Sequence, residues 1–388
     1  MYLLLSLSSL LLLYLFFILK SSYCFCAVQN CTILFLSFVF TGHNRKTVVC
    51  YSIDNKNSCL KEGFIMISAK ENVSRLYQHK MPEYQPFMGQ GIINNVPVTG
   101  YQERSCGRGS RGRDWFGVEW IWPEGEPASF PSNEILLEDI CDWKDVLHFP
   151  DLDNFDWEEA ARKDRIPAFD RKHNLLYQMI HNGLFERLHT LMGFEDALCA
   201  LLTDPDEIAE FFDALADYKC KLIDYIAKYY QPDIICYHDD WGTERGLFFS
   251  PETWRDLIKE PTKRIIDHVH SKGILFELHS DGDIHDLIPE IVEDLKPDAL
   301  NIMEINNIPE MKKLTGDKVV YNVFMNTRAL DVMDAAQPVT EEQVRTFTRD
   351  TLHRNGKGGF YIPCLILCRP EWQAIIMDEY EKIKFDIL

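Results

Sequence analysis

From about residue 195 to the end of the chain, segments with a helical spacing of apolar residues alternate with short apolar runs typical of strands. The strand-like runs cover 232–240, 274–281, 298–304, 318–326 and 358–364. The helical patterns cover 204–230, 250–273, 283–295, 308–316, 340–356 and 370–385, and Pro261 is expected to kink the second of these. Repeated strand–helix units with apolar strands predict a parallel sheet covered by helices.

Five such units, with room for three more between about 85 and 200, predict an α/β fold: a single (β/α)8 TIM barrel with an N-terminal extension. No glycine-rich dinucleotide fingerprint follows any strand, which disfavours a nucleotide-binding sheet. Barrel enzymes place their chemistry at the carboxyl ends of the strands. The residues at those ends include many acid–base groups and metal ligands: His238, Asp239, Asp240, His279, Asp281, Glu304, Asn306, Asn326 and Cys364.

The first 65 residues differ from the rest. Residues 2–19 form an apolar run about long enough to cross a bilayer. No Lys or Arg precedes this run, as a secretory signal would require. The Lys-Glu-Gly stretch at 61–63 can be encoded by a purine-rich ribosome-binding sequence, and Met66 follows at a suitable distance. We therefore expect 1–65 to be translated upstream sequence and 66–388 to be the folded domain; a membrane-like leader is the alternative.

Charge and cysteine content restrict the class of protein. The formal net charge of −20 argues against binding nucleic acid or an anionic membrane, because both require basic surfaces. The cysteines after residue 65 are scattered and imply no disulfide framework. Residues 66–388 therefore have the composition of an acidic, cytoplasmic enzyme.

Several motifs, taken in their order and spacing, resemble those of the uroporphyrinogen decarboxylase superfamily. They are MISAKENVSRLYQHKMPEYQPF at 66–87, DWFGVEW at 114–120, HDDWG at 238–242, SPETWRDLIKEPTKRIIDHVHSKG at 250–273 and LHSDG at 278–282. The resemblance covers essentially all of 66–388. It implies a (β/α)8 barrel with its cleft at the carboxyl ends of the strands. The superfamily contains cofactor-free uroporphyrinogen decarboxylases and zinc-dependent methyltransferases that work with corrinoid proteins or thiols.

The resemblance also implies a metal site. The methyltransferase branch typically carries His-x-Cys at the end of one strand and a further Cys near the last strand. Here His279 and Cys364 stand near those places, and Asp281 replaces the middle Cys. His279 and Asp281 are two residues apart and therefore lie on one face of a strand. A carboxylate in place of a thiolate keeps zinc acceptable, shifts the preference toward harder ions, and favours activation of an alcohol or ether oxygen.

A second group of candidates would handle the substrate. His238, Asp239 and Asp240 could act as a catalytic proton shuttle, because two adjacent carboxylates repel each other and raise one pKa. We expect Trp115, Phe116 and Trp241 to line the cleft, with Glu304 and Asn326 contacting the substrate from the ends of their strands.

Structural explanations remain open for these residues. His279 could cap the following helix or lie in the barrel core, and Asp281 could belong to an ordinary strand-to-helix turn. Cys364 could be a small buried apolar residue. His238, Asp239 and Asp240 could form a loop with capping carboxylates.

We predict a metal-dependent methyltransferase that moves a methyl group between a small methylated metabolite and a corrinoid protein. Uroporphyrinogen decarboxylase is the first alternative. Its polycarboxylate substrate requires several cations, the arginine-rich signature of that branch is absent in its usual form, and the chain is strongly acidic. A non-catalytic binding barrel is the second alternative. The methyl donor and the oligomeric state, a homodimer included, are left open.

Overall fold

The computed structural model describes residues 67–99, 101, 106–126 and 128–388 in full, together with the backbone of four strands between residues 24 and 64. The chain divides into two units, Met1–Ile67 and Ser68–Leu388. In the first unit, an antiparallel sheet runs in chain order through β1 (Cys24–Gln29), β2 (Thr32–Thr41), β3 (Arg45–Ser52) and β4 (Cys59–Phe64). The apolar run 2–19 and Met66 lie outside the described residues, and the start at Met66 stays a prediction. None of the helices in the described part is long and apolar enough to cross a membrane.

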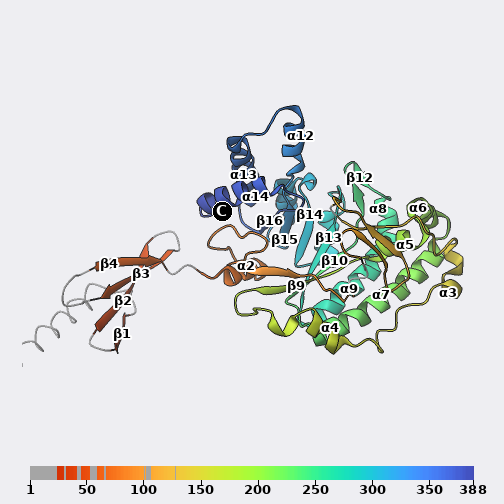
Figure 1. The fold of residues 1–388 in the computed structure, drawn as a ribbon, viewed down its shortest axis with the longest axis horizontal. Helices are drawn as coiled ribbons and strands as arrows, with labels where there is room; N and C mark the ends of the chain where they lie inside the picture. The colour runs from red at the N-terminus through yellow and green to blue at the C-terminus, as the bar shows by residue number, and fades with distance from the viewer. Residues whose placement is uncertain are drawn as a thin grey trace, which may run out of the picture. The chain divides into compact units, whose positions relative to one another are not determined.

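The second unit is built on a curled sheet of seven parallel strands, each paired with the next one along the chain (Figure 1). These are β5 (Ile92–Asn95), β9 (Leu175–Ile180), β10 (Ile234–His238), β13 (Leu275–Ser280), β14 (Ala299–Met303), β15 (Val320–Phe324) and β16 (Tyr361–Cys364). The five strands predicted after residue 195 are present. From β9 onward most strand residues are buried, as expected for a parallel sheet covered by helices, whereas only Ile92 is buried in β5. The parallel α/β architecture is therefore confirmed.

The described residues differ from the prediction between 85 and 200, where β5 and β9 join the main sheet and a third strand was expected. Instead, β6 (Ser110–Arg113), β7 (Glu119–Trp122) and β8 (Phe130–Pro131) form a small antiparallel sheet of their own. The Oδ1 atom of Asp114 accepts the N–H groups of Phe116 at 2.9 Å and Val118 at 3.0 Å, which stabilises the turn between β6 and β7. These local hydrogen bonds turn the chain back on itself before it can cross to the sheet.

The segment just before β5 joins the two outer strands of the main sheet. The N–H of Met88 donates to the carbonyl of Pro363 in β16 at 3.0 Å, and the side-chain amide of Gln85 donates to the carbonyl of Tyr361 at 2.6 Å. Residues 85–88 therefore cover the outer edge of β16 and lead into β5, without a described eighth strand. This cover satisfies backbone groups that an open edge would leave unpaired.

Helices cover the sheet (Figure 1). They are α2 (Ala69–Tyr77), α3 (Trp143–Val146), α4 (Trp157–Lys163), α5 (Leu184–Met192), α6 (Phe194–Thr203), α7 (Pro205–Tyr229), α8 (Pro251–Thr253), α9 (Lys259–Ser271), α10 (Ile288–Glu290), α11 (Ile308–Thr315), α12 (Arg328–Ala336), α13 (Glu341–Gly356) and α14 (Pro370–Ile383). The predicted patterns agree closely with α7, α11, α13 and α14. The pattern at 283–295 is helical only from residue 288 onward.

The helix that contains Pro261 changes its hydrogen bonding ahead of the proline. Residues Trp254–Ile258 (η3) form a π-helical turn between α8 and α9. Proline has no N–H, and its ring crowds the carbonyl four residues earlier, here that of Leu257. The wider turn spans the position of this crowding, in place of the simple kink that was predicted.

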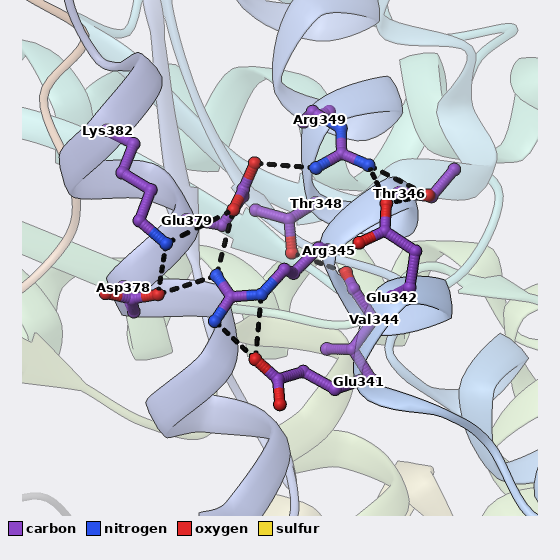
Figure 2. Close-up of polar contacts among 10 residues, drawn as sticks. All are labelled: Glu341, Glu342, Val344, Arg345, Thr346, Thr348, Arg349, Asp378, Glu379 and Lys382. Carbon is purple, nitrogen blue, oxygen red and sulfur yellow. Dashed lines mark hydrogen bonds and ion pairs between the residues drawn. The ribbon is translucent and has the colours of Figure 1, made fainter.

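An ion-pair network joins α13 to α14 (Figure 2). The carboxylate of Glu379 on α14 accepts hydrogen bonds from Arg345 at 2.9 Å and Arg349 at 2.8 Å, both on α13. Thr340 and Gln343 form a capping box at the start of α13. The two helices that follow β15 and β16 are thus fixed to each other at the β16 edge of the sheet.

A candidate metal centre at the carboxyl ends of the strands

One row of residues across four neighbouring strands builds the centre of the site. His238 at the end of β10 is in register with His279 in β13, His279 with Asn301 in β14, and Asn301 with Asn322 in β15. Residues in register point to the same face of a sheet. The rings of His238 and His279 are consequently stacked, with centroids 3.9 Å apart and an angle of 21° between their planes.

Asp240, two residues beyond β10, joins the two histidines. One potential ligand atom from each of His238, Asp240 and His279 lies within 4.8 Å of the others. The Nε2 atom of His279 is 3.4 Å from Oδ1 of Asp240, and Nδ1 of His238 is 4.0 Å from the same oxygen. Both histidines are buried and Asp240 is partly buried. Two imidazoles and a carboxylate are typical ligands of catalytic zinc and of non-haem iron.

Hydrogen bonds to other groups orient both histidine rings. Nδ1 of His238 lies 2.8 Å from Oε2 of Glu186, and Nδ1 of His279 lies 2.6 Å from Oδ1 of Asn301. Because both partners are acceptors, each Nδ1 carries the proton and each Nε2 is the atom left for another partner. The Nε2 atom of His279 is buried and makes no hydrogen bond. A buried nitrogen without a partner fits a metal ligand.

The loops after β10 and β13 hold Asp240 in place by binding each other. The N–H of Asp281 donates to Oδ1 of Asp240 at 2.8 Å, and the N–H of Trp241 donates to the hydroxyl of Ser280 at 2.9 Å. Gly242 and Gly282 meet directly: a Cβ added to Gly282 would lie 2.2 Å from the carbonyl carbon of Gly242. The HDDWG and LHSDG motifs are therefore two halves of one interlocked structure.

Charges inside the site favour an ionised Asp240. Burial raises the pKa of Asp240, but the neighbouring histidines outweigh that effect and bring it well below its usual range. Burial lowers the pKa of His279, while Asp240 and Asp281 act in the opposite direction and raise it to about 9. Burial raises the pKa of Asp281. A cation could bind between such an anionic carboxylate and the neighbouring imidazole, in place of the proton that the imidazole carries.

A cavity of about 1080 Å³ opens beside this centre. Asp281 and Phe324 line the cavity and also contact the centre. Asp281 lies 3.7 Å from Nε2 of His279, and the ring of Phe324 packs edge-on against the ring of His279. About half of the other wall residues are apolar, and they come from the end of β14, from the segments after β14, β15 and β16 and from α11, α12 and α13: Met303, Ile305, Ile308, Pro309, Met325, Ala329, Val332, Phe347, Ile366 and Leu367.

The arginines of the cavity wall are both paired with carboxylates. Arg328 contacts Glu244 at 3.0 Å, and Arg354 forms an ion pair with Glu304. Glu304 also accepts the N–H of Asn326, so two predicted substrate residues lie together on this wall. Among the described lining residues no arginine or lysine is therefore left for an anionic ligand.

Asp239 has a different position from the predicted proton shuttle. It is fully buried and accepts the N–H groups of Leu184 at 3.1 Å and Glu186 at 2.9 Å, which caps α5. Gly183 makes this approach possible, since a Cβ there would lie 2.4 Å from Asp239. Burial and the nearby Glu186 raise the pKa of Asp239 to about 7. The capping alternative describes Asp239, whereas His238 and Asp240 belong to the site.

The predicted aromatic wall is also differently placed. Trp241 is fully buried, donates to Asp239 at 2.9 Å and packs on Trp254. Phe116 lies under the guanidinium of buried Arg187, and Trp115 packs among other aromatic rings. None of the three predicted aromatic residues lines the cavity described above.

Of the three predicted metal ligands, the structure brings two together. His279 and Asp281 are neighbours, as given above, but Cys364 lies in β16, which β14 and β15 separate from β13. Glu186 and Asn301 were missed. The register of Asn301 with His279 could have indicated Asn301, whereas Glu186 precedes its partner His238 by 52 residues and carried no local signal.

Comparison with known proteins agrees with this class of fold and site. Residues 183–362 match the family model of uroporphyrinogen decarboxylase (URO-D), and this range contains the whole candidate metal centre. A solved structure of a methyltransferase from Methanosarcina mazei superposes with a TM-score of 0.57 at 11% sequence identity, covering 82% of this chain and 99% of that chain. Residues 183–362 are thus similar to the uroporphyrinogen decarboxylase family, the resemblance that the motifs indicated, and the solved structure supports the fold.

A weaker structural similarity adds nothing to the family match or to the fold. An endo-1,4-beta-xylanase from Caldicellulosiruptor owensensis superposes with a TM-score of 0.34 at 13% identity, over 58% of this chain and 75% of that chain, and supports no argument. No curated protein sequence matches the chain.

Proposed function

We propose that the chain is a metal-dependent methyltransferase that moves a methyl group between a small methylated metabolite and a corrinoid protein. The observation that carries this proposal is the position of His238, Asp240 and His279 beside an apolar cavity whose arginines are both neutralised. A divalent ion held there would supply a Lewis acid that polarises a donor oxygen. The corrinoid, carried by its partner protein, would be the other reactant of the methyl transfer.

The residues of the chain would bind the donor and handle its proton. Apolar side chains such as Met303, Phe324 and Phe347 would surround the methyl group and exclude water. Asp281 lies between the centre and the cavity, where its carboxyl could hold a proton for the oxygen that loses the methyl group. Each of these roles follows from a side chain that lines the cavity.

The paired arginines weigh against the decarboxylase alternative. A substrate with many carboxylates needs free cations around it. Arg328 and Arg354 are both bound to glutamates, and Asp281 and Asp350 add negative charge to the same wall. The free cysteines from Cys106 to Cys368 support the further proposal that the protein works in the reducing cytoplasm.

The test is a methyl-transfer assay on the full chain with and without added Zn²⁺. Free reduced corrinoid would be the acceptor, and methanol, methyl ethers, methylamines and methyl thioethers the donors. We expect a metal-dependent change in corrinoid absorbance with an oxygen-bound methyl donor. Decarboxylation of uroporphyrinogen by the same preparation, with no transfer from any donor, would overturn the proposal.

A further inference from the structure

The metal ligands suggested by family resemblance and those brought together by the fold are different sets. Resemblance points to His279, Asp281 and Cys364. In the fold, Cys364 lies on β16, three strand positions from β13, and its thiol is not part of the group formed by His238, Asp240 and His279. Its thiol lies 3.9 Å from the carbonyl of Leu365. Asp281 reaches His279, but its side chain is half exposed and faces the cavity.

We propose that His238, Asp240 and His279 hold a divalent metal without any thiolate, and that Glu186 is the positioning residue that orients His238. This inference deepens the proposed function and rests on its metal requirement. Its first support is the grouping of two buried imidazoles and one carboxylate. Its second support is the Nε2 atom of His279, which forms no hydrogen bond in a side chain only 3% exposed and faces the carboxylate of Asp240 at 3.4 Å.

The two histidines are prepared for one ion by similar contacts. Glu186 accepts from Nδ1 of His238, and Asn301 accepts from Nδ1 of His279. Both contacts fix a ring through Nδ1, and binding of the second ring nitrogen to the metal is the usual arrangement around metal-bound histidines. Oδ1 of Asp240, the oxygen nearest to both histidines, also accepts the N–H of Asp281, which fixes the carboxylate in place.

Glu186 is itself firmly held, which is what a positioning residue needs. Its side chain is almost fully buried in the first turn of α5. Its N–H donates to Asp239, and its Oε2 also accepts the N–H of Asn182 at 3.1 Å. The carboxylate therefore has little freedom to leave His238. A charged acceptor also makes the imidazole a stronger ligand than a neutral amide does.

The donor set selects a class of metal. Nitrogen and oxygen ligands without sulfur suit Zn²⁺, Fe²⁺, Co²⁺ and Mn²⁺, and they disfavour Cu⁺, which prefers thiolates. Asp281, left outside the ligand set, would then face the substrate. The departure from the superfamily pattern at this position would be a change of ligand set, in which residues of β10 replace both cysteines.

The experiment measures metal binding by the full chain without turnover. Zn²⁺ affinity is obtained by competition with a chromophoric chelator for the unaltered chain and for His238→Ala, Asp240→Asn and His279→Ala. Cys364→Ala and Asp281→Asn are the matched controls, since they remove the ligands of the competing set. We expect at least tenfold weaker binding in the first three variants and unchanged binding in the two controls.

The opposite outcome, with metal lost in Cys364→Ala and kept in His238→Ala, would overturn the inference, as would no metal binding by the unaltered chain. Glu186→Gln tests the positioning role. We expect a 10- to 100-fold loss of Zn²⁺ affinity and an altered visible spectrum of the Co²⁺-loaded chain. An unchanged spectrum would reject that role. Because these readouts need no methyl donor, metal binding without methyl transfer would contradict only the proposed function.

Discussion

At the scale of single residues, adjacent side chains of the same chemistry have unrelated roles. Asp239 is buried and caps α5, while Asp240 points to the two histidines. The difference arises because consecutive side chains leave the end of a strand in opposite directions. Position 282 requires a glycine, because its φ is +82° and a Cβ there would collide with the backbone of Gly242.

Gly282→Ala should therefore destabilise the protein by roughly 2–4 kcal/mol, through backbone strain and through the collision with Gly242. The matched control is Gly273→Ala. Gly273 also has a positive φ, +71°, but a Cβ there meets nothing within 4 Å, so we expect a loss of about 1 kcal/mol. Urea unfolding of both variants measures the difference. Equal losses would show that contact with Gly242 is unimportant.

At the scale of elements, the helices are attached to the sheet and to one another by a few polar contacts. His270 near the end of α9 binds Asp298 just before β14 at 2.8 Å, and the same carboxylate accepts the N–H of Phe276 in β13. On the β16 side, Glu379 joins α14 to two arginines of α13 (Figure 2). These contacts join segments that are far apart in the sequence.

His270→Ala should lower stability in a pH-dependent way. The hydrogen bond with Asp298 raises the pKa of His270 in the folded protein. The ion pair therefore stabilises the fold fully below the unfolded pKa of about 6.5, and this contribution is lost as pH rises through the folded value. Urea midpoints should differ between variant and parent at pH 5.5 and converge at pH 9. A constant difference would contradict this.

Glu379→Gln should have the opposite pH dependence. Arg349, followed by Arg345, lowers the pKa of Glu379, so its contribution is present above the unfolded pKa and disappears as pH falls through the folded value. We expect a lower thermal midpoint than the parent at pH 7 and no difference at strongly acidic pH. Glu342→Gln is the control, because Glu342 is exposed and binds only one of the two arginines, Arg349, besides accepting a hydrogen bond from Thr346 at 3.4 Å. A control with an equal loss would argue against a special role of Glu379.

At the scale of the whole molecule, residues 85–88 join the two outer strands of the sheet. Gln85 is fully buried and donates to Tyr361, and the hydroxyl of Tyr380 on α14 donates to the carbonyl of Gln85. This short segment thus binds the last strand and the last helix together. The curl of the sheet brings the carboxyl ends of its strands to one side, where the centre and the cavity lie next to each other.

Gln85→Leu should cost roughly 1–3 kcal/mol, because the carbonyl of Tyr361 would lose its buried side-chain donor. Hydrogen exchange should increase most in β5 and β16, the two strands that this segment joins. Gln78→Leu, at an exposed position after α2, should change neither quantity. Protection that stays the same in β5 and β16 would mean that the joining of these strands does not depend on Gln85.

Much of the second half of the chain could be predicted because hydrophobic periodicity is local. The strands β10, β13, β14, β15 and β16 occur where apolar runs were found, and His238, His279 and Asp240 lie at the predicted ends. Periodicity failed between 85 and 200, where Asp114 turns the chain into a small antiparallel sheet. A hydrogen bond from one side chain leaves no trace in the spacing of apolar residues.

Contacts between residues far apart in the sequence could be found only in the folded chain. Local pattern predicted that polar groups end these strands, and it placed His279 among them as a candidate. Local pattern could not show that Glu186, and not Asp239, contacts His238. Nor could it show that His238, and not Cys364, lies beside His279, because both depend on strand order, register and interlocked loops. Strand ends far apart along the chain become neighbours only when parallel pairing aligns them, and coordination depends on that alignment.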